Sequence, residues 1–161
     1  MIALQPVTSE SRLREAFGCF PSGVTAVCAL IDGVPHGMAA SSFTSVSLAP
    51  PLVSLCIQRT SSTWPRLRDR RLGLSVLAEG QDDACRRLSS RGDRFRGIPW
   101  QPGPDGGVFI TGSSALLECS LEEEVPAGDH LIALLRIHGL HTAETPPLVF
   151  HGSRFRRLAA V

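Results

Sequence analysis

The stretch that decides the fold runs from residue 36 to residue 57 and reads HGMAASSFTSVSLAPPLVSLCI. Two β-prone runs, residues 46–48 and 52–57, are separated by Ala49-Pro50-Pro51 and preceded by small and hydroxylated residues. Core packing does not need so many serines and threonines. Hydroxyl donors beside tight backbone with free N–H groups can hold a phosphate or a polyol without a large charged pocket. The stretch therefore predicts strands that carry a polar ligand site.

Composition limits the classes of protein that this chain can be. Its 161 residues with 43% apolar content suit one core, so we expect a single domain over residues 1–161. The 16 basic and 15 acidic residues leave a net charge of +1, which argues against a broad nucleic-acid surface. Lysine is absent from the sequence, so arginine is the only fixed cation available for phosphates.

The location and the metal content can also be predicted. No run approaches the roughly eighteen apolar residues of a membrane span, and the N-terminus lacks the pattern of a signal peptide, so we expect a cytoplasmic protein. The five cysteines form no C-x-x-C pair and have an odd total, which argues against a disulfide framework and a zinc site. His138 and His141 would point to opposite faces of a strand, which disfavours joint metal ligation. We expect no metal site.

Apolar runs bounded by turn residues predict a mainly β chain. The predicted strands cover residues 24–31, 34–40, 46–48, 52–58, 72–78, 114–123, 130–141, and 147–151 with 155–158, the last of these completing the sheet. Asp32-Gly33 predicts a two-residue hairpin turn, because this pair tolerates positive φ. Residues 97–112, rich in Gly and Pro, are expected to form a loop.

Helices are expected at three places. Thr8 or Ser9 can cap a helix with an apolar face that ends before Pro21, residues 61–63 can cap a short helix through Leu67, and residues 81–90 form a third. The apolar face of the first helix would hold Leu13, Ala16, Phe17 and Phe20. Many strands with a few small helices favour a barrel with helices over its openings.

The stretch 36–57, with residues 20–25 before it, resembles the flavin reductase family with an FMN-binding split barrel, the small reductase partners of two-component monooxygenases. The resemblance extends from about Leu13 to Leu158. Further matching segments follow in the family's order, at residues 59–63, 74–77 followed by Gln81, 93–95, 115–119 and 127–130. The resemblance implies a mainly β fold with some α, a split β-barrel of Greek-key type with short flanking helices.

The resemblance also implies where a flavin, FMN or FAD, would lie. The backbone around Thr25 and at Met38, Ala39 and Ala40 would face the ring. The ribityl chain and phosphate would meet the hydroxyls of Ser41, Ser42, Ser61, Ser62 and Thr63 and the strand backbone at Ser54, Cys56 and Ile57, with Arg59 or Arg94 neutralising charge. The alternative for the serine-rich loops is that they only cap helices and turns.

The second substrate would be NADH or NADPH. His130, after Gly128-Asp129, and Phe155 are the candidates for contacting the nicotinamide. We expect no catalytic side chain, because the flavin carries the chemistry and the protein aligns two rings. The chain has no G-x-G-x-x-G or Walker pattern, so a nicotinamide dinucleotide would bind outside a Rossmann unit.

Three functions stay open at this point. The first is an NAD(P)H-dependent reductase that releases reduced flavin to a flavin-dependent monooxygenase. The second is a flavoprotein of the same barrel type that keeps its flavin and acts on another substrate, such as a pyridoxamine phosphate or a corrinoid. The third is a flavin-binding module without turnover. An open groove on a barrel of this size would expose an apolar patch, so we expect a homodimer with the groove near the interface.

Overall fold

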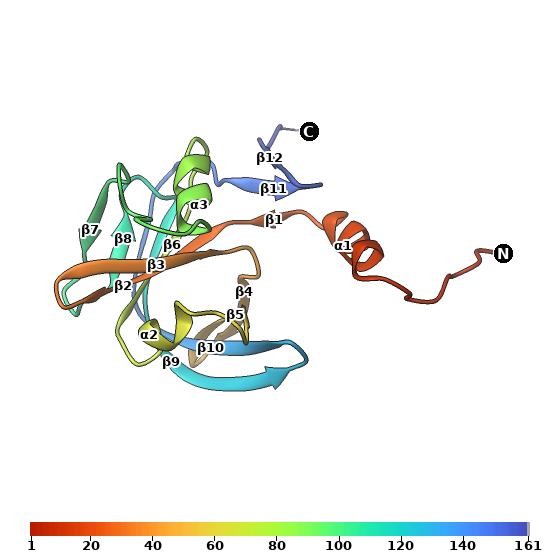
Figure 1. Cartoon of the computed structure of the whole chain (residues 1–161). Coiled ribbons are helices and arrows are strands. Elements are labelled where there is room, and N and C mark those ends of the chain that lie inside the picture. Colours follow the sequence, from red (N-terminus) through yellow and green to blue (C-terminus); the bar gives the residue numbers. More distant parts are fainter. Residues whose placement is uncertain (161) are drawn as a thin grey trace.

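The computed structural model describes residues 1–160 and is built mainly of β-strands, with three helices in that range (Figure 1). The helices are Glu10–Gly18 (α1), Trp64–Leu67 (α2) and Asp82–Leu88 (α3). The strands are Ser22–Gly23 (β1), Thr25–Ile31 (β2), Val34–Ala40 (β3), Thr44–Leu48 (β4), Pro51–Gln58 (β5), Leu72–Val76 (β6), Trp100–Pro102 (β7), Val108–Ile110 (β8), Ala115–Ala127 (β9), His130–Thr142 (β10), Val149–His151 (β11) and Arg154–Arg156 (β12).

Seven strands form the main sheet in the order β3-β2-β6-β9-β10-β5-β4, and the pairings given for it are antiparallel. The predicted hairpin between β2 and β3 is confirmed, because Ile31 pairs with Val34 and the turn residues Asp32 and Gly33 have φ values of 52° and 78°. The mostly β content predicted from the sequence is therefore confirmed.

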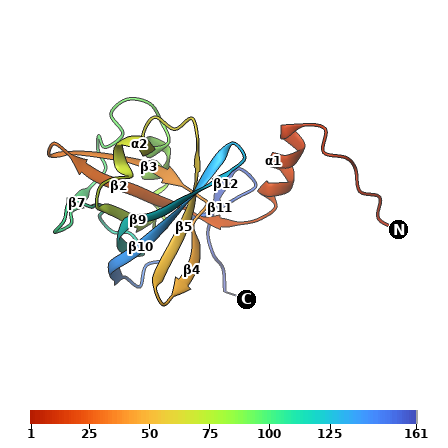
Figure 2. The same cartoon turned by 90° about the horizontal axis from the view of Figure 1, so that it is seen from below.

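The main sheet is strongly curved. Its edge strands β3 and β4 are consecutive in the chain, and residues 41–43 between them can span at most about 14 Å. A flat sheet of seven strands would separate its edges by about 29 Å. The sheet must therefore curl until its edges approach each other, yet β3 and β4 are not hydrogen-bonded neighbours, so it stays open along one side (Figure 2).

The core lies on both faces of β2. Val27, Ala29 and Ile31 point into the curled sheet, where Trp64 and Leu67 of α2 are also buried. Alternate residues of β2 point the other way and pack against α3, the β8 strand and Leu148. Because β2 is buried on both faces, packing fixes its position, and pairing with β2 fixes the position of the edge strand β3.

Two expectations about the later chain were wrong. Residues 97–112 are not only a loop, because β7 and β8 pair there as a two-stranded ribbon. Backbone contact explains it: the carbonyl of Val108 approaches Gly73 of β6 so closely that only glycine fits. The C-terminal strands β11 and β12 do not complete the main sheet, because they form a separate three-stranded sheet in which β11 pairs with β1 and with β12.

The first helix forms where the sequence predicts it, but its apolar face is not covered. In α1 no residue is buried, and Phe17 and the following Phe20 are 69% and 80% exposed. Figure 1 shows α1 projecting from the body of the molecule, with the N-terminal residues extending beyond it. The expected cap is also absent, since Ser9 makes no side-chain capping bond. Within residues 1–160, none of the helices has the length and apolar character needed to cross a membrane.

Candidate functional site

A cavity of about 530 Å³ lies beside the open edge of the curled sheet, and we call it the hydroxyl pocket. It is bordered by the end of β3 and the turn after it, by outward residues of β5, by the loop between β5 and α2, by the end of α3 and by the start of β10. Its lining consists of Met38, Ala39, Ala40, Ser41, Ser42, Cys56, Gln58, Thr60, Ser61, Ser62, Thr63, Leu88, Ser89, Arg94 and His130. Many of the residues predicted from the sequence therefore meet here.

One wall of the hydroxyl pocket is an edge strand. Because β3 pairs only with β2 in the main sheet, its outer edge has no strand partner, and the carbonyl of Gly37 on β3 accepts a hydrogen bond from Arg94. Ala39 and Ala40 have short side chains, so a flat group can approach this backbone closely. Thr25 does not line the pocket: it is 2% exposed and its hydroxyl donates to the carbonyl of Ala40 at 2.9 Å, which supports the end of β3 from behind.

Some of the hydroxyls already have structural partners. Ser42 Oγ donates to the carbonyl of Cys56 at 3.2 Å and accepts its N–H at 2.9 Å, which ties the turn after β3 to β5. Ser61 Oγ accepts the N–H of Trp64 at 3.1 Å at the start of α2. Within residues 1–160, the hydroxyls of Ser41, Thr60 and Ser62 make no such bonds, and they can donate to a ligand.

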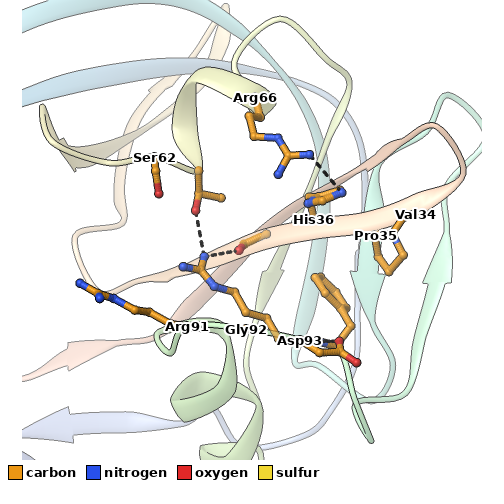
Figure 3. A pocket seen from close by; sticks show the side chains of 12 residues that line it. Val34, Pro35, His36, Ser62, Arg66, Arg91, Gly92 and Asp93 are labelled. Atoms are coloured by element: carbon orange, nitrogen blue, oxygen red, sulfur yellow. Dashed lines mark hydrogen bonds between the residues drawn. The ribbon is translucent and has the colours of Figure 1, made fainter.

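Arg94 is held rigidly at the border of the hydroxyl pocket. Its Nε donates to the carbonyl of Ser90 at 2.7 Å, and its Nη1 donates to the carbonyl of Gly37 and to Thr63 Oγ1, both at 2.9 Å (Figure 3). Three bonds fix the plane of the guanidinium, and Nη2 makes none within the described chain. A fixed arginine beside hydroxyl groups is the arrangement that binds a phosphate.

Arg59 lies elsewhere. Its Nη1 donates to the carbonyl of Gly128 at 3.5 Å, and its backbone N–H donates to the carbonyl of Asp129 at 3.0 Å. It is bonded to the turn before β10 and does not line the hydroxyl pocket. Ser54 and Ile57 are also outside the lining, with Ile57 buried in the core at 1% exposure. Of the two arginines expected to neutralise a phosphate, only Arg94 reaches the cavity.

His130, the first residue of β10, also lines the pocket. Its Nδ1 lies 2.7 Å from Asp129 Oδ1, and its side chain is 36% exposed. Hydrogen bonding from His130, followed by its charge, lowers the pKa of the Asp129 carboxyl below its ordinary value. An ionised Asp129 accepts the Nδ1 proton, so Nε2 of the ring is left for a ligand.

Phe155 is not brought beside His130. It lies in β12, with its ring 5.4 Å from that of Phe150 and 5.1 Å from the guanidinium carbon of Arg86. Phe150 lines a smaller cavity of about 200 Å³ that shares Ala39, Ala40, Ser41 and Ser89 with the hydroxyl pocket. Phe155 therefore packs against Phe150 and does not itself line the hydroxyl pocket.

A second cavity of about 780 Å³ adjoins the first, and we call it the arginine pocket. Ser62, Thr63 and Arg94 line both cavities. The sequence reasoning missed its other polar residues, His36, Arg66 and Arg91, as well as Gln58 and Thr60 of the hydroxyl pocket. The run Ser-Arg-Gly-Asp-Arg at 90–94 is a signal that could have pointed to Arg91, whereas nothing local marks His36.

The arrangement suits a ligand with three parts. The edge backbone of β3, with Met38, offers a surface for a flat ring. The free hydroxyls suit a polyol chain, and Arg94 with Thr63 suits a phosphate ester. Within residues 1–160, no group of three or more His, Cys, Asp or Glu side chains is placed to hold a metal ion. The residues of this site can bind such a ligand and orient it.

Comparisons with known proteins show the family of this chain. A family profile described as "Flavin reductase like domain" matches residues 17–159. The chain is 41% identical over 147 residues, 89% of this chain and 75% of the other, to the reductase subunit HsaB of a flavin-dependent monooxygenase from Rhodococcus jostii. It is 38% identical over 159 residues, 92% of this chain and 85% of the other, to an NADH-dependent FAD reductase of Streptomyces globisporus.

A solved structure shows the same fold. The NADH:FAD oxidoreductase of Streptomyces globisporus, in complex with NAD and FAD fragments, superposes with a TM-score of 0.89 at 37% sequence identity. The match covers 97% of this chain and 98% of that one.

Proposed function

Because this chain belongs to the flavin reductase like domain family, we propose that it is an NAD(P)H-dependent flavin reductase that supplies reduced flavin to a partner monooxygenase. The observation that carries the proposal is the hydroxyl pocket at the open edge of the sheet, with free hydroxyls and the fixed guanidinium of Arg94. One relative is an NADH-dependent FAD reductase, which supports the nicotinamide and flavin substrates. Another is the reductase subunit of a flavin-dependent monooxygenase, which supports the partner.

The proposal gives the flavin one orientation in the hydroxyl pocket. The ring would lie against the backbone at Met38, Ala39 and Ala40, and the ribityl chain would meet Ser41 and Ser62. The phosphate would bind at Arg94 and Thr63, where the guanidinium and hydroxyl already converge at 2.9 Å. Thr25, Ser42 and Ser61 would act indirectly, because their hydroxyls hold the pocket's backbone in shape.

The nicotinamide would bind from the side of His130. When bound, the flavin accepts hydride from the nicotinamide, and no nucleophile of the protein is needed. The task of the chain is to stack two rings at contact distance and to keep them aligned. Asp129 orients the imidazole of His130, so that Nε2 can hydrogen-bond the carboxamide or a phosphate of the nicotinamide dinucleotide.

The molecule that does this would be a homodimer. The apolar side chains of α1 and of the preceding residues are exposed in one chain, and a monomer in water rarely leaves such a surface open. We propose that α1 covers a second copy of this chain and that the flavin groove lies near that interface. We further propose that the curled sheet is a split barrel forming one domain, in a cytoplasmic enzyme.

Anaerobic spectroscopy tests the proposed function. NADH or NADPH added to the protein with excess FMN or FAD should bleach the flavin absorbance near 450 nm in many turnovers per chain. Bleaching that stops at one equivalent of flavin would indicate a flavoprotein that keeps its cofactor for another substrate. No bleaching with bound flavin would leave a binding module and would contradict the proposal.

A further inference from the structure

The arginine pocket has no assigned role in reducing a flavin ring. Its arginine side chains come from two elements: Arg66 from α2, and Arg91 and Arg94 from the loop after α3. Figure 3 shows Arg66 and Arg91 on opposite sides of the cavity, with His36 of β3 facing Arg66. The one carboxylate in the lining, Asp93, accepts the N–H of Phe95 at 3.2 Å. The cavity is therefore positively charged on several sides.

Arg66 is oriented by His36. Its Nη2 lies 3.5 Å from His36 Nε2. Partial burial, followed by the charges of Arg66 and Arg70, lowers the pKa of His36, against an opposing effect of Asp32. A neutral imidazole accepts a hydrogen bond from the guanidinium, so His36 directs Arg66 without neutralising its charge.

The two pockets adjoin at the place where the flavin phosphate would bind. Ser62, Thr63 and Arg94 line both cavities. A group joined to the flavin through that phosphate would therefore leave the hydroxyl pocket and enter the arginine pocket. FMN ends at this phosphate, whereas FAD continues with a second phosphate and adenosine.

The rest of the arginine pocket suits such an extension. Val34, Pro35 and Phe95 give it an apolar side, where a purine base can pack. The volume of about 780 Å³ lies within the range of about 300–1,000 Å³ that small-molecule sites occupy. An apolar side beside two guanidinium groups matches a nucleotide better than it matches a simple anion.

We propose that the arginine pocket binds the adenylate phosphate and adenosine of FAD, through Arg66 and Arg91, and makes this chain prefer FAD to FMN. The inference rests on the proposed function, because it takes the flavin phosphate to lie at Arg94. The same adenylate chemistry occurs in NADH, so the test must distinguish a flavin from a nicotinamide dinucleotide as its source.

Calorimetric titration of the purified protein with FAD and with FMN measures the preference directly. The variants are Arg66→Ala, Arg91→Ala and the double variant, and Arg87→Ala on α3 is the matched control, since it removes an exposed arginine that does not line either pocket. Each charge-assisted bond lost should weaken FAD binding roughly tenfold or more. The Kd for FMN should stay within about twofold, and Arg87→Ala should change neither.

Three results would overturn the inference. An equal loss for FMN and FAD would mean that the two arginines act on the shared phosphate or on folding. An unchanged Kd for FAD in the double variant would remove them from the flavin site. A higher KM for NADH with FMN as the flavin, and unchanged FAD binding, would assign the pocket to the nicotinamide dinucleotide.

The same titrations separate this inference from the proposed function. Flavin binding is read without turnover, so the FAD preference can be measured whether or not NADH reduces the flavin. A chain that binds FAD through Arg66 and Arg91 but shows no reduction by NADH or NADPH would refute the reductase and leave the subsite. As a second check, Arg94→Ala should weaken FMN and FAD alike and leave riboflavin, which has no phosphate, much less affected.

Discussion

At the scale of single residues, some side chains of the site form hydrogen bonds that hold the fold, and others are free to bind a ligand. The hydroxyls of Ser42 and Ser61 are taken by backbone groups, whereas those of Ser41 and Ser62 make no hydrogen bond within residues 1–160. Arg94 does both, because three bonds hold it while Nη2 stays available. A serine-rich sequence therefore indicates where a site lies without saying which hydroxyl binds.

His130 gives the residue-scale prediction. If its imidazole positions the nicotinamide, His130→Ala should raise the KM for NADH and lower kcat modestly, because hydride transfer depends steeply on the alignment of the rings. The Kd for flavin should stay close to that of the parent. Steady-state kinetics and flavin titration on one preparation measure all three constants.

The competing role for His130 is to hold the turn before β10 through its 2.7 Å contact with Asp129. That role predicts a lower Tm and unchanged kinetics in the molecules that remain folded. His141→Ala is the matched control, since His141 is an exposed residue of the same strand and lies outside the hydroxyl pocket. Unaltered nicotinamide kinetics in His130→Ala would exclude this residue from the site.

At the scale of elements, backbone packing determines how β6 meets β8. A Cβ added at Gly73 would lie 2.2 Å from the carbonyl oxygen of Val108 and 2.7 Å from its nitrogen, and these are backbone atoms that cannot rotate away. Gly107 is also close to the backbone of β6, because a Cβ added at Gly107 would lie 2.8 Å from the nitrogen of Gly73. Two glycines thus allow the β7–β8 ribbon to lie against the main sheet.

Gly73→Ala should therefore destabilise the protein. The added methyl must push β8 away from β6, at a cost of about 3 kcal/mol or more in the free energy of unfolding, which lowers the Tm by roughly 6–12 °C in a chain of this size. Gly139→Ala is the control, because a Cβ there meets nothing within 4 Å. Thermal denaturation followed by circular dichroism compares the two, and equal Tm values would contradict this packing.

At the scale of the whole molecule, the feature that a single chain leaves unexplained is α1. The helix projects from the body in both views of the fold (Figures 1 and 2), and Phe17 and the following Phe20 are exposed. It stays connected to the C-terminal sheet, since Gly152 donates its N–H to the carbonyl of Gly18 at 3.1 Å. A helix that is anchored at its end but has no buried residue is the feature on which the proposed homodimer rests.

Light scattering at micromolar concentration should give a mass near twice the 17.3 kDa of one chain. The double substitution Phe17→Glu with Phe20→Glu should shift the protein to the monomer, because it places charges where apolar surface would be buried. Arg12→Ser, on the same helix, is the control and should stay dimeric. A monomeric parent would refute the proposed homodimer and would require another partner for α1.

The sequence by itself determined the features that depend on local patterns. Apolar runs bounded by turn residues and Asp32-Gly33 are sufficient for β2, β3 and their turn, because neighbouring residues set these conformations. Motifs in family order pointed to the loop at 61–63 and to Arg94, and both lie at the hydroxyl pocket. The family resemblance is confirmed by the match over residues 17–159.

Only the tertiary structure decided what depends on segments far apart in the chain. The β7–β8 ribbon forms because Gly73 admits the backbone of Val108, a contact that no local pattern records. Arg59 and Arg94 looked equivalent in the sequence, yet one is bonded to the turn at Gly128 and the other reaches the cavity. Arg66 and Arg91 line the same pocket because the curled sheet brings β3 between α2 and the loop after α3. Long-range packing places charges together in this way, and spacing along the chain does not encode it.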